Sequence, residues 1–268
     1  MRARGLVLFS LAGLLLVGWP AQGGDGVRPE ETALTVFAAA SLRDAFGALG
    51  TAFERAHPGV QVRFNFGGSQ ELRTQIEQGA PADVFASADN RHMDAARAEG
   101  LVEAPTLLAT NTPVMVVPSD NPGKVRGLAD LPRAKRVVIG APEVPIGAYT
   151  LQILERARAR LGADFPERVL ARVVSRELNV RQVLTKVVLG EADAGLVYRT
   201  DARSAGDRVG VVEIPSEVNV VAQYPIAVVT RAPHPELARQ WIALVTGAEG
   251  QAVLARAGFG SRATASRK

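Results

Sequence analysis

The sequence contains no cysteine at any position. A disulfide framework is therefore excluded, and so is a lipid anchor attached to an N-terminal cysteine. Aromatic residues are scarce at 5%, and the three histidines, His57, His92 and His234, show no metal-ligand spacing. Stability must then come from burial of an apolar core, and a chain of this length is long enough to form one.

The motifs of the common enzyme classes are also missing. We find no Gly-x-Ser-x-Gly elbow, no phosphate-binding P-loop and no Gly-x-Gly-x-x-Gly after a strand. Asp83 and Asp89 flank one predicted strand and offer a carboxylate pair for acid–base chemistry. The simpler interpretation is that Asp83 begins the strand and Asp89 caps the helix starting at Asn90. The sequence therefore favours a binding protein over an enzyme, without catalytic residues or a directly coordinated metal.

Charge of one sign is not concentrated in any region. From residue 24 onward, 29 basic residues face 27 acidic ones, and the two kinds are interspersed. A nucleic-acid-binding face needs clustered Lys and Arg, so nucleic acid is not an expected partner. Apolar residues make up 47% and charged residues 22%, which is typical of a soluble globular protein.

The first 23 residues have the pattern of a secretory signal peptide. Arg2 and Arg4 precede an apolar run at 6–17, and small residues surround a cleavage point expected between Gly23 and Gly24. The run has 12 residues, whereas a bilayer span needs roughly 20. An uncleaved anchor or a misassigned start is the alternative. We expect a soluble, monomeric mature protein in the periplasm.

Short apolar strands alternate with amphipathic helices, which predicts α/β architecture with parallel sheets. Strands are predicted at 34–37, 60–66, 83–86, 137–139, 172–175 and 195–198. Two β-rich runs, at 113–118 and 224–229, stand apart from this alternation. We interpret them as crossings between two lobes, with a single continuous domain as the alternative. The predicted division is 30–113 plus 226–261 for lobe 1, 114–225 for lobe 2, and a polar tail at 262–268.

Three predicted helices begin at uncharged hydrogen-bond donors, namely Ser41, Ser69 and Asn179-Val180. In open α/β sheets ligands bind at strand ends, and helix N-termini carry unsatisfied N–H groups with partial positive charge. A cleft that gathers several such helix starts would bind an anion. A serine at a helix start is usually only a cap, so each serine taken alone favours capping over binding, and Ser41 with Asp44 resembles a capping box.

Seven short sequence blocks follow one another along the mature chain, and each occurs once. They are 36–42, 66–69, 79–89, 142–147, 179–181, 195–198 and 224–226. Together they resemble the periplasmic molybdate-binding proteins of ABC importers. The resemblance implies an α/β, two-lobe periplasmic-binding-protein fold of type II, with two crossing strands and a ligand cleft between the lobes. It also implies capture of molybdate or tungstate, delivery to a membrane permease, and no cofactor.

In that family the oxyanion is held by two serines of the first lobe, backbone amides of the second, and a tyrosine hydroxyl. The resemblance assigns these roles to five residues: Ser41 and Ser69, the amides of Ile146 and Val180, and Tyr198. This chain departs from the family in two places. Gly67-Gly68 replaces a serine-rich run, and the turn before Ile146 is one residue shorter, with Ile where Ala is more common.

The chemistry of the ligand agrees with this set of donors. Molybdate and tungstate are fully deprotonated at neutral pH and offer only acceptor oxygens, whereas a protonated phosphate also needs an acceptor. Two alternatives to molybdate binding stay open. One is a protein that binds another tetrahedral oxyanion such as sulfate, and the other is a periplasmic enzyme that acts on an anionic substrate.

Overall fold

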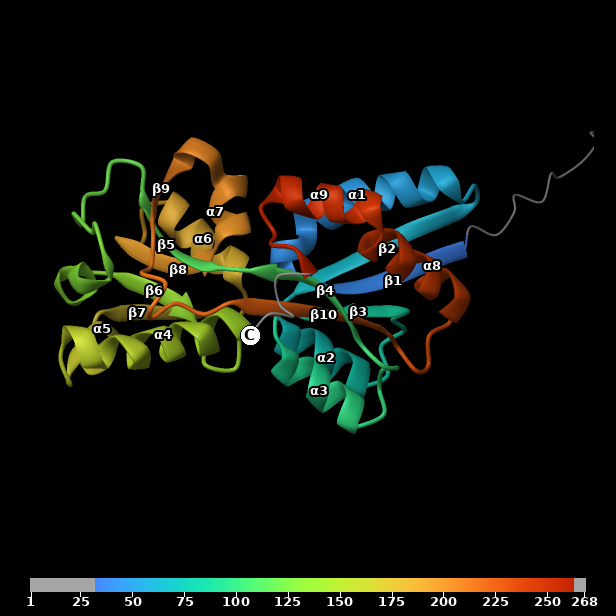
Figure 1. Ribbon diagram of the computed structural model, residues 1–268, viewed down its shortest axis with the longest axis horizontal. Coiled ribbons are helices and arrows are strands. Elements are labelled where there is room, and N and C mark those ends of the chain that lie inside the picture. The colour runs from blue at the N-terminus through green and yellow to red at the C-terminus, as the bar shows by residue number, and fades with distance from the viewer. Residues whose placement is uncertain (1–31, 263–268) are drawn as a thin grey trace, which may run out of the picture. The chain divides into compact units, whose positions relative to one another are not determined.

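The structure, a computed structural model, describes residues 32–262, so the predicted signal peptide and nearly all of the predicted tail lie outside it. Two five-stranded mixed sheets organise the chain (Figure 1). The first sheet has the order β2 (Val60–Gly67), β1 (Thr32–Ala39), β3 (Val84–Ala86), β10 (Ala222–Val228), β4 (Thr106–Asn111). The second has the order β7 (Val173–Glu177), β6 (Val137–Gly140), β8 (Ala194–Tyr198), β5 (Pro113–Pro118), β9 (Val209–Val212).

The two sheets share one topology. In each, three parallel strands lie beside a strand that enters from the other sheet and runs antiparallel to its neighbours; this strand is β10 in the first sheet and β5 in the second. We call the first sheet with its helices lobe 1 and the second with its helices lobe 2. The predicted two-lobe α/β architecture is confirmed.

Helices cover both faces of each sheet (Figure 1). In lobe 1, α1 (Arg43–Ala56), α8 (Pro235–Thr246) and α9 (Ala248–Ala257) lie on one face, and α2 (Ser69–Glu77) and α3 (Asn90–Ala98) on the other. In lobe 2, α4 (Pro145–Leu161) and α5 (Phe165–Leu170) lie on one face, and α6 (Val180–Val188) and α7 (Arg199–Ala205) on the other. Short 3₁₀ turns occupy Ala40–Leu42, Leu128–Arg133 and Gly206–Arg208.

The core explains why the strands are apolar at nearly every position. Leu34 and Val36 of β1 pack under α1, while Phe37 points to the opposite face and packs under α2 and α3. On the α1 face, Trp241 is fully buried and meets Phe46 edge-on at 5.3 Å. Strands buried on both faces lose the alternation of polar and apolar residues that marks a half-exposed sheet.

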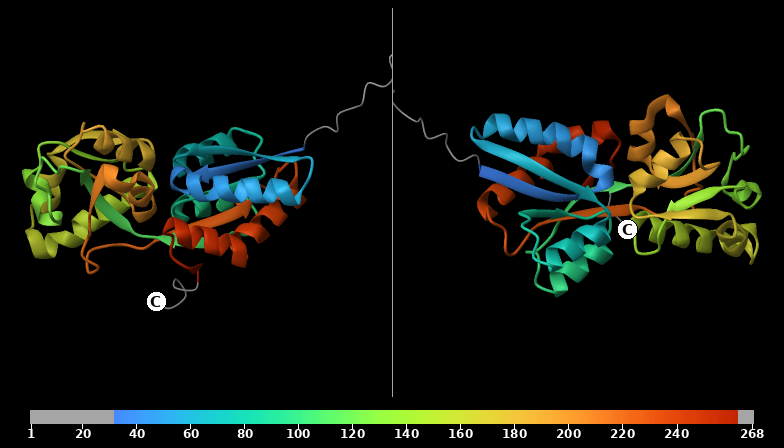
Figure 2. Two further views of the ribbon diagram at one scale, coloured as in Figure 1. Left: turned by 90° about the horizontal axis from the view of Figure 1, so that it is seen from above. Right: turned by 180° about the vertical axis from the view of Figure 1, so that it is seen from behind.

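Two crossings join the lobes, one at Thr112 between β4 and β5 and the other at 213–221 between β9 and β10 (Figure 2). Residues 222–225, which the sequence assigned to lobe 2, pair with β4 in the first sheet, and Pro113 pairs with Tyr198 in the second. An apolar run does not show which sheet will receive it. Pro225 lies at a register shift of β10, where its missing N–H is tolerated and where the strand pattern is interrupted.

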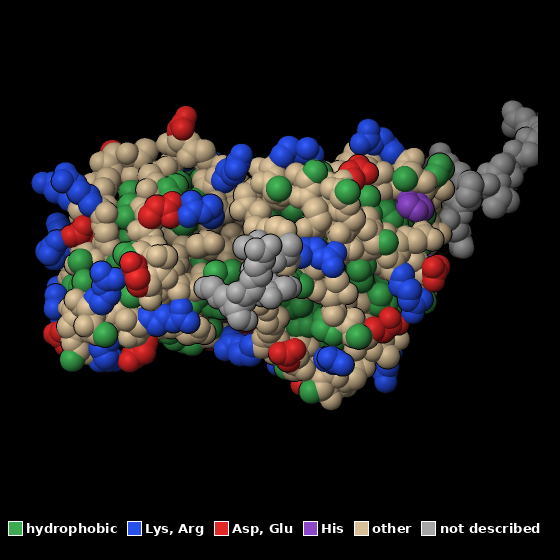
Figure 3. Space-filling model, in the orientation of Figure 1, with side chains coloured by type: hydrophobic (Ala, Val, Ile, Leu, Met, Phe, Trp, Pro, Cys, Tyr) green, Lys and Arg blue, Asp and Glu red, His purple; other side chains and the backbone are tan. Residues whose placement is uncertain are grey.

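Within residues 32–262, no helix combines the length and hydropathy needed to cross a bilayer. Lys and Arg side chains are mixed with Asp and Glu over the face shown in Figure 3. On this face, the even distribution of charge expected from the sequence is therefore present.

Candidate anion-binding site

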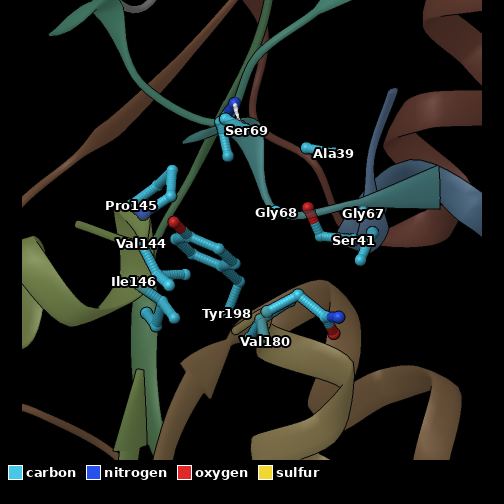
Figure 4. Close-up of a pocket in the computed structure, with 13 residues that line it drawn as sticks. Ala39, Ser41, Gly67, Gly68, Ser69, Val144, Pro145, Ile146, Val180 and Tyr198 are labelled. Carbon is cyan, nitrogen blue, oxygen red and sulfur yellow. Dashed lines mark hydrogen bonds between the residues drawn. The ribbon is translucent and has the colours of Figure 1, made fainter. Parts of the chain in front are cut away.

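A small hollow lies where the two lobes meet (Figure 4). Lobe 1 contributes the ends of β1 and β2, the residues directly after them, and one residue after β3. Lobe 2 contributes the starts of α4 and α6 and the end of β8. The lining residues are Ala39, Ala40, Ser41, Gly67, Gly68, Ser69, Ala88, Val144, Pro145, Ile146, Asn179, Val180 and Tyr198. The structure thus brings together all five residues singled out from the sequence: Ser41, Ser69, Ile146, Val180 and Tyr198.

None of the residues that line the hollow carries a charge. Its positive potential comes instead from the N-termini of α2, α4 and α6, which have 9, 17 and 9 residues. The N-cap residues of α2 and α4, Gly68 and Val144, make no side-chain capping bond. The first-turn N–H groups of a helix have no acceptor within that helix, so these two N-termini leave donors for a ligand.

The first donors of α4 and α6 are those expected from the sequence. Pro145 occupies the first position of α4 and has no N–H, so Ile146 supplies the first amide donor of that helix. Val180 is the first residue of α6, and the preceding Asn179 caps the helix by accepting from the N–H of Gln182 at 3.1 Å. The predicted cap at Asn179 is confirmed, and it leaves the amide of Val180 unused by the cap.

The two serines do not cap their helices, so the predicted capping box at Ser41 is wrong. Ser41 lies in the 3₁₀ turn before α1, and its Oγ is 2.9 Å from the hydroxyl of Tyr224. The extra turn places Leu42 rather than Ser41 at the N-cap position. Ser69 is the first residue of α2, and its Oγ accepts a hydrogen bond from the N–H of Ala88 at 3.0 Å.

Tyr198 is the most informative side chain of the hollow. The residue is 1% exposed, and its hydroxyl has no hydrogen-bond partner among the described residues. It points to the side of the hollow formed by Ser69 and Pro145 (Figure 4). Burial raises the pKa of Tyr198 well above its usual value, so the group stays a neutral donor. A buried donor without a partner costs about 1–3 kcal/mol, which a ligand oxygen would offset.

Hydrogen bonds hold the lobes together around the hollow. Gln70 of α2 donates to the carbonyl oxygen of Leu178 in lobe 2 at 2.8 Å. From α3, Arg91 Nη2 donates to the carbonyl of Glu143 at 2.6 Å, and His92 Nε2 to the same oxygen at 2.8 Å. Burial lowers the pKa of His92, which favours the neutral imidazole as donor.

An ion cluster behind the hollow links its walls. The carboxylate of Asp201 is fully buried, lies 2.7 Å from Nε of Arg181, and accepts from the N–H of Tyr198 at 3.3 Å. Arg181 also reaches Asp44 of lobe 1 at 2.6 Å. Burial raises the pKa of Asp201 to about 6, although Arg181 and the N–H of Tyr198 act in the opposite direction.

This raised pKa predicts a pH-dependent contribution to stability. A carboxyl whose pKa is higher in the folded state stabilises the fold at low pH, and that contribution is lost as pH rises through about 6. Relative to the ordinary aspartate pKa of 3.8, the difference corresponds to about 3 kcal/mol. The stability of the wild type relative to Asp201→Asn should therefore fall between pH 4 and pH 7 in urea unfolding experiments. A pH-independent difference would contradict this.

The acidic residues considered for catalysis have structural partners. Asp83 accepts from the N–H groups of Thr35 at 2.7 Å and His234 at 2.6 Å. Asp89 caps α3 by accepting from the N–H of His92 at 3.0 Å. Both structural interpretations are confirmed. In the part of the chain that the structure describes, no group of three or more His, Asp or Glu is placed to hold a metal ion.

Fold and site are those of a two-lobe protein with a small uncharged hollow between its lobes. The chain belongs to the bacterial extracellular solute-binding protein family, whose model matches residues 34–260. Its sequence is 45% identical over 253 residues to the molybdate-binding protein ModA of Mycobacterium tuberculosis, with 93% of each chain covered.

Solved structures show the same fold. The sulfate-binding protein SubI of Mycobacterium tuberculosis matches with a TM-score of 0.77 at 23% identity, covering 85% of this chain and 86% of that one. The periplasmic molybdate-binding protein of Azotobacter vinelandii matches with a TM-score of 0.73 at 20% identity, covering 85% and 99%. The type II two-lobe fold is thereby confirmed. Since it serves both a sulfate and a molybdate binder, the fold alone does not identify the ligand.

Proposed function

We propose that this protein is an extracytoplasmic solute-binding protein that captures molybdate, and also tungstate, in the hollow between its lobes. It delivers the oxyanion to the membrane permease of an ABC importer. The observation that supports this most directly is the composition of the hollow, which offers hydroxyl and amide donors and no charged group. The 45% identity to a molybdate-binding protein favours this anion over others.

The donors match an anion that carries no proton. The N–H of Ala88 already occupies the oxygen of Ser69, so the proton of Ser69 is available to a ligand. Tyr198 adds an unpartnered hydroxyl, and Ile146 and Val180 add helix-start amides. Oriented dipoles of this kind hold a desolvated dianion without a counter-charge. A protonated phosphate would bring a donor, for which the hollow lacks a carboxylate acceptor.

Export by way of the predicted signal peptide would remove residues 1–23 and release a soluble monomer into the periplasm. No cofactor is required, and molybdenum is held through its oxygens rather than by protein ligands. The lining residues bind and do not catalyse, because neither a general base nor a nucleophile pair lies among them.

Titration with molybdate, tungstate, sulfate and phosphate tests the proposal. A ligand at a hundredfold excess over its Kd stabilises the folded state by about 2.7 kcal/mol, which for a chain of this size raises Tm by roughly 5–10 °C. We expect this shift with molybdate and tungstate, together with a binding isotherm in calorimetry, and no shift with phosphate. If millimolar molybdate has no effect and sulfate gives a clear shift, the protein is a sulfate binder.

A further inference from the structure

A buried hydrogen-bond chain lies behind Ser41, outside the hollow. Tyr224 of β10 is 0% exposed, and its hydroxyl lies 2.9 Å from Oγ of Ser41. Asn111, at the end of the neighbouring strand β4, is 2% exposed, and its Nδ2 lies 3.4 Å from the same hydroxyl. Neither Tyr224 nor Asn111 is among the residues that line the hollow.

The direction of each hydrogen bond behind Ser41 follows from the chemistry of the Asn111 amide. Its Oδ1 accepts from the N–H of Thr112 at 3.0 Å, which fixes the orientation of the amide. Its Nδ2 therefore faces Oγ1 of Thr200, at 2.9 Å, and the hydroxyl of Tyr224. An amide NH₂ only donates, so Tyr224 accepts from Asn111 and has its own proton left to give.

The proton of Tyr224 has one acceptor within reach, Oγ of Ser41. Burial raises the pKa of Tyr224 well above its usual value, so this proton stays on the phenol. Once Oγ of Ser41 accepts from Tyr224, its own proton must point elsewhere, and Ser41 lines the hollow. The backbone N–H of Ala88 acts on Ser69 in the same way, so both serines present a proton to the ligand.

We propose that Tyr224, oriented by Asn111, is a positioning residue that makes Ser41 a donor toward the hollow and thereby helps to select oxyanions that carry no proton. This inference rests on the proposed function. Because the proton of Ser41 is then directed into the hollow, it faces a bare ligand oxygen favourably and the proton of hydrogen phosphate unfavourably. These hydrogen bonds also connect the two lobes. Thr200 belongs to α7 of lobe 2, whereas Asn111, Tyr224 and Ser41 belong to lobe 1.

The test is a double-mutant cycle on molybdate affinity, measured by calorimetry at neutral pH with wild type, Tyr224→Phe, Ser41→Ala and the double variant. In the wild-type background Tyr224→Phe should weaken molybdate binding about five- to tenfold. In the Ser41→Ala background it should change affinity less than about twofold, because the hydroxyl it orients is gone. Equal losses in both backgrounds would mean that Tyr224 acts through packing, and would overturn the proposal.

Two further measurements complete the design. Tyr149→Phe removes the hydroxyl of a neighbouring tyrosine, whose ring lies 6.4 Å from that of Tyr198, and serves as the matched control with unchanged affinity. The ratio of phosphate Kd to molybdate Kd should fall in Tyr224→Phe, since the hydroxyl of Ser41 can then rotate and turn a lone pair toward the proton of hydrogen phosphate. Wild-type affinity or an unchanged ratio in Tyr224→Phe refutes the role of Tyr224. A wild-type protein that binds no molybdate refutes the proposed function itself.

Discussion

Replacing Tyr198 by Phe should lower the affinity for molybdate about tenfold or more and hardly change the melting temperature of the unliganded protein. The hydroxyl has no partner in the described chain, so removing it breaks no bond of the fold. The ring keeps its edge contact with Tyr224, at 5.7 Å between centroids. In the complex the variant lacks one bond to a charged ligand, which contributes roughly 1.5–3 kcal/mol.

Calorimetry and thermal melting of the same preparation separate the two effects. Tyr149→Phe is again the control, because it removes a tyrosine hydroxyl from a residue that does not line the hollow and whose ring lies 6.4 Å from that of Tyr198. If Tyr198→Phe binds molybdate as tightly as the wild type, the hydroxyl does not contact the ligand. The assignment of Tyr198 as a binding residue would then be wrong.

Gly68→Ala should have a still larger effect on binding, on the order of a hundredfold or more, because it would keep the lobes from meeting. A Cβ at Gly68 would lie far inside van der Waals contact with the carbonyl oxygen of Leu178, a backbone atom of lobe 2 that no rotamer change can move. The lobe 2 donors Ile146, Val180 and Tyr198 would then not reach a ligand held by lobe 1.

The fold of this variant should survive. Gly68 has φ −70° and ψ 141°, a conformation open to any residue, so alanine adds no backbone strain within lobe 1. Gly47→Ala in α1 is the control, since Gly47 does not line the hollow and an added Cβ there meets no atom within 4 Å. Calorimetry should show wild-type-like affinity for Gly47→Ala. Equal affinities in the two variants would show that the contact between Gly68 and Leu178 does not limit closure.

The sequence by itself predicted those features that depend on residues a few positions apart. The strands before the helices, the cap at Asn179 and the cap at Asp89 were all visible as local patterns, and each is present. Two strands, β4 and β9, and two α-helices, α5 and α7, were not predicted. The strands among them carry weak local signals, such as Gly210 inside β9, and form because β10 and β5 offer edges to pair with.

Only the tertiary structure decided what the hydroxyl groups of the site do. The local sequence around Ser41 favours a helix cap, yet its partner is Tyr224, 183 residues further along the chain. Gly68 of lobe 1 likewise lies against the carbonyl oxygen of Leu178 in lobe 2. No local sequence pattern in either lobe predicts this contact. Capping and periodicity are set by neighbours within one or two helical turns. The direction of a proton and the fit of two lobes depend on residues that only the folded chain brings together.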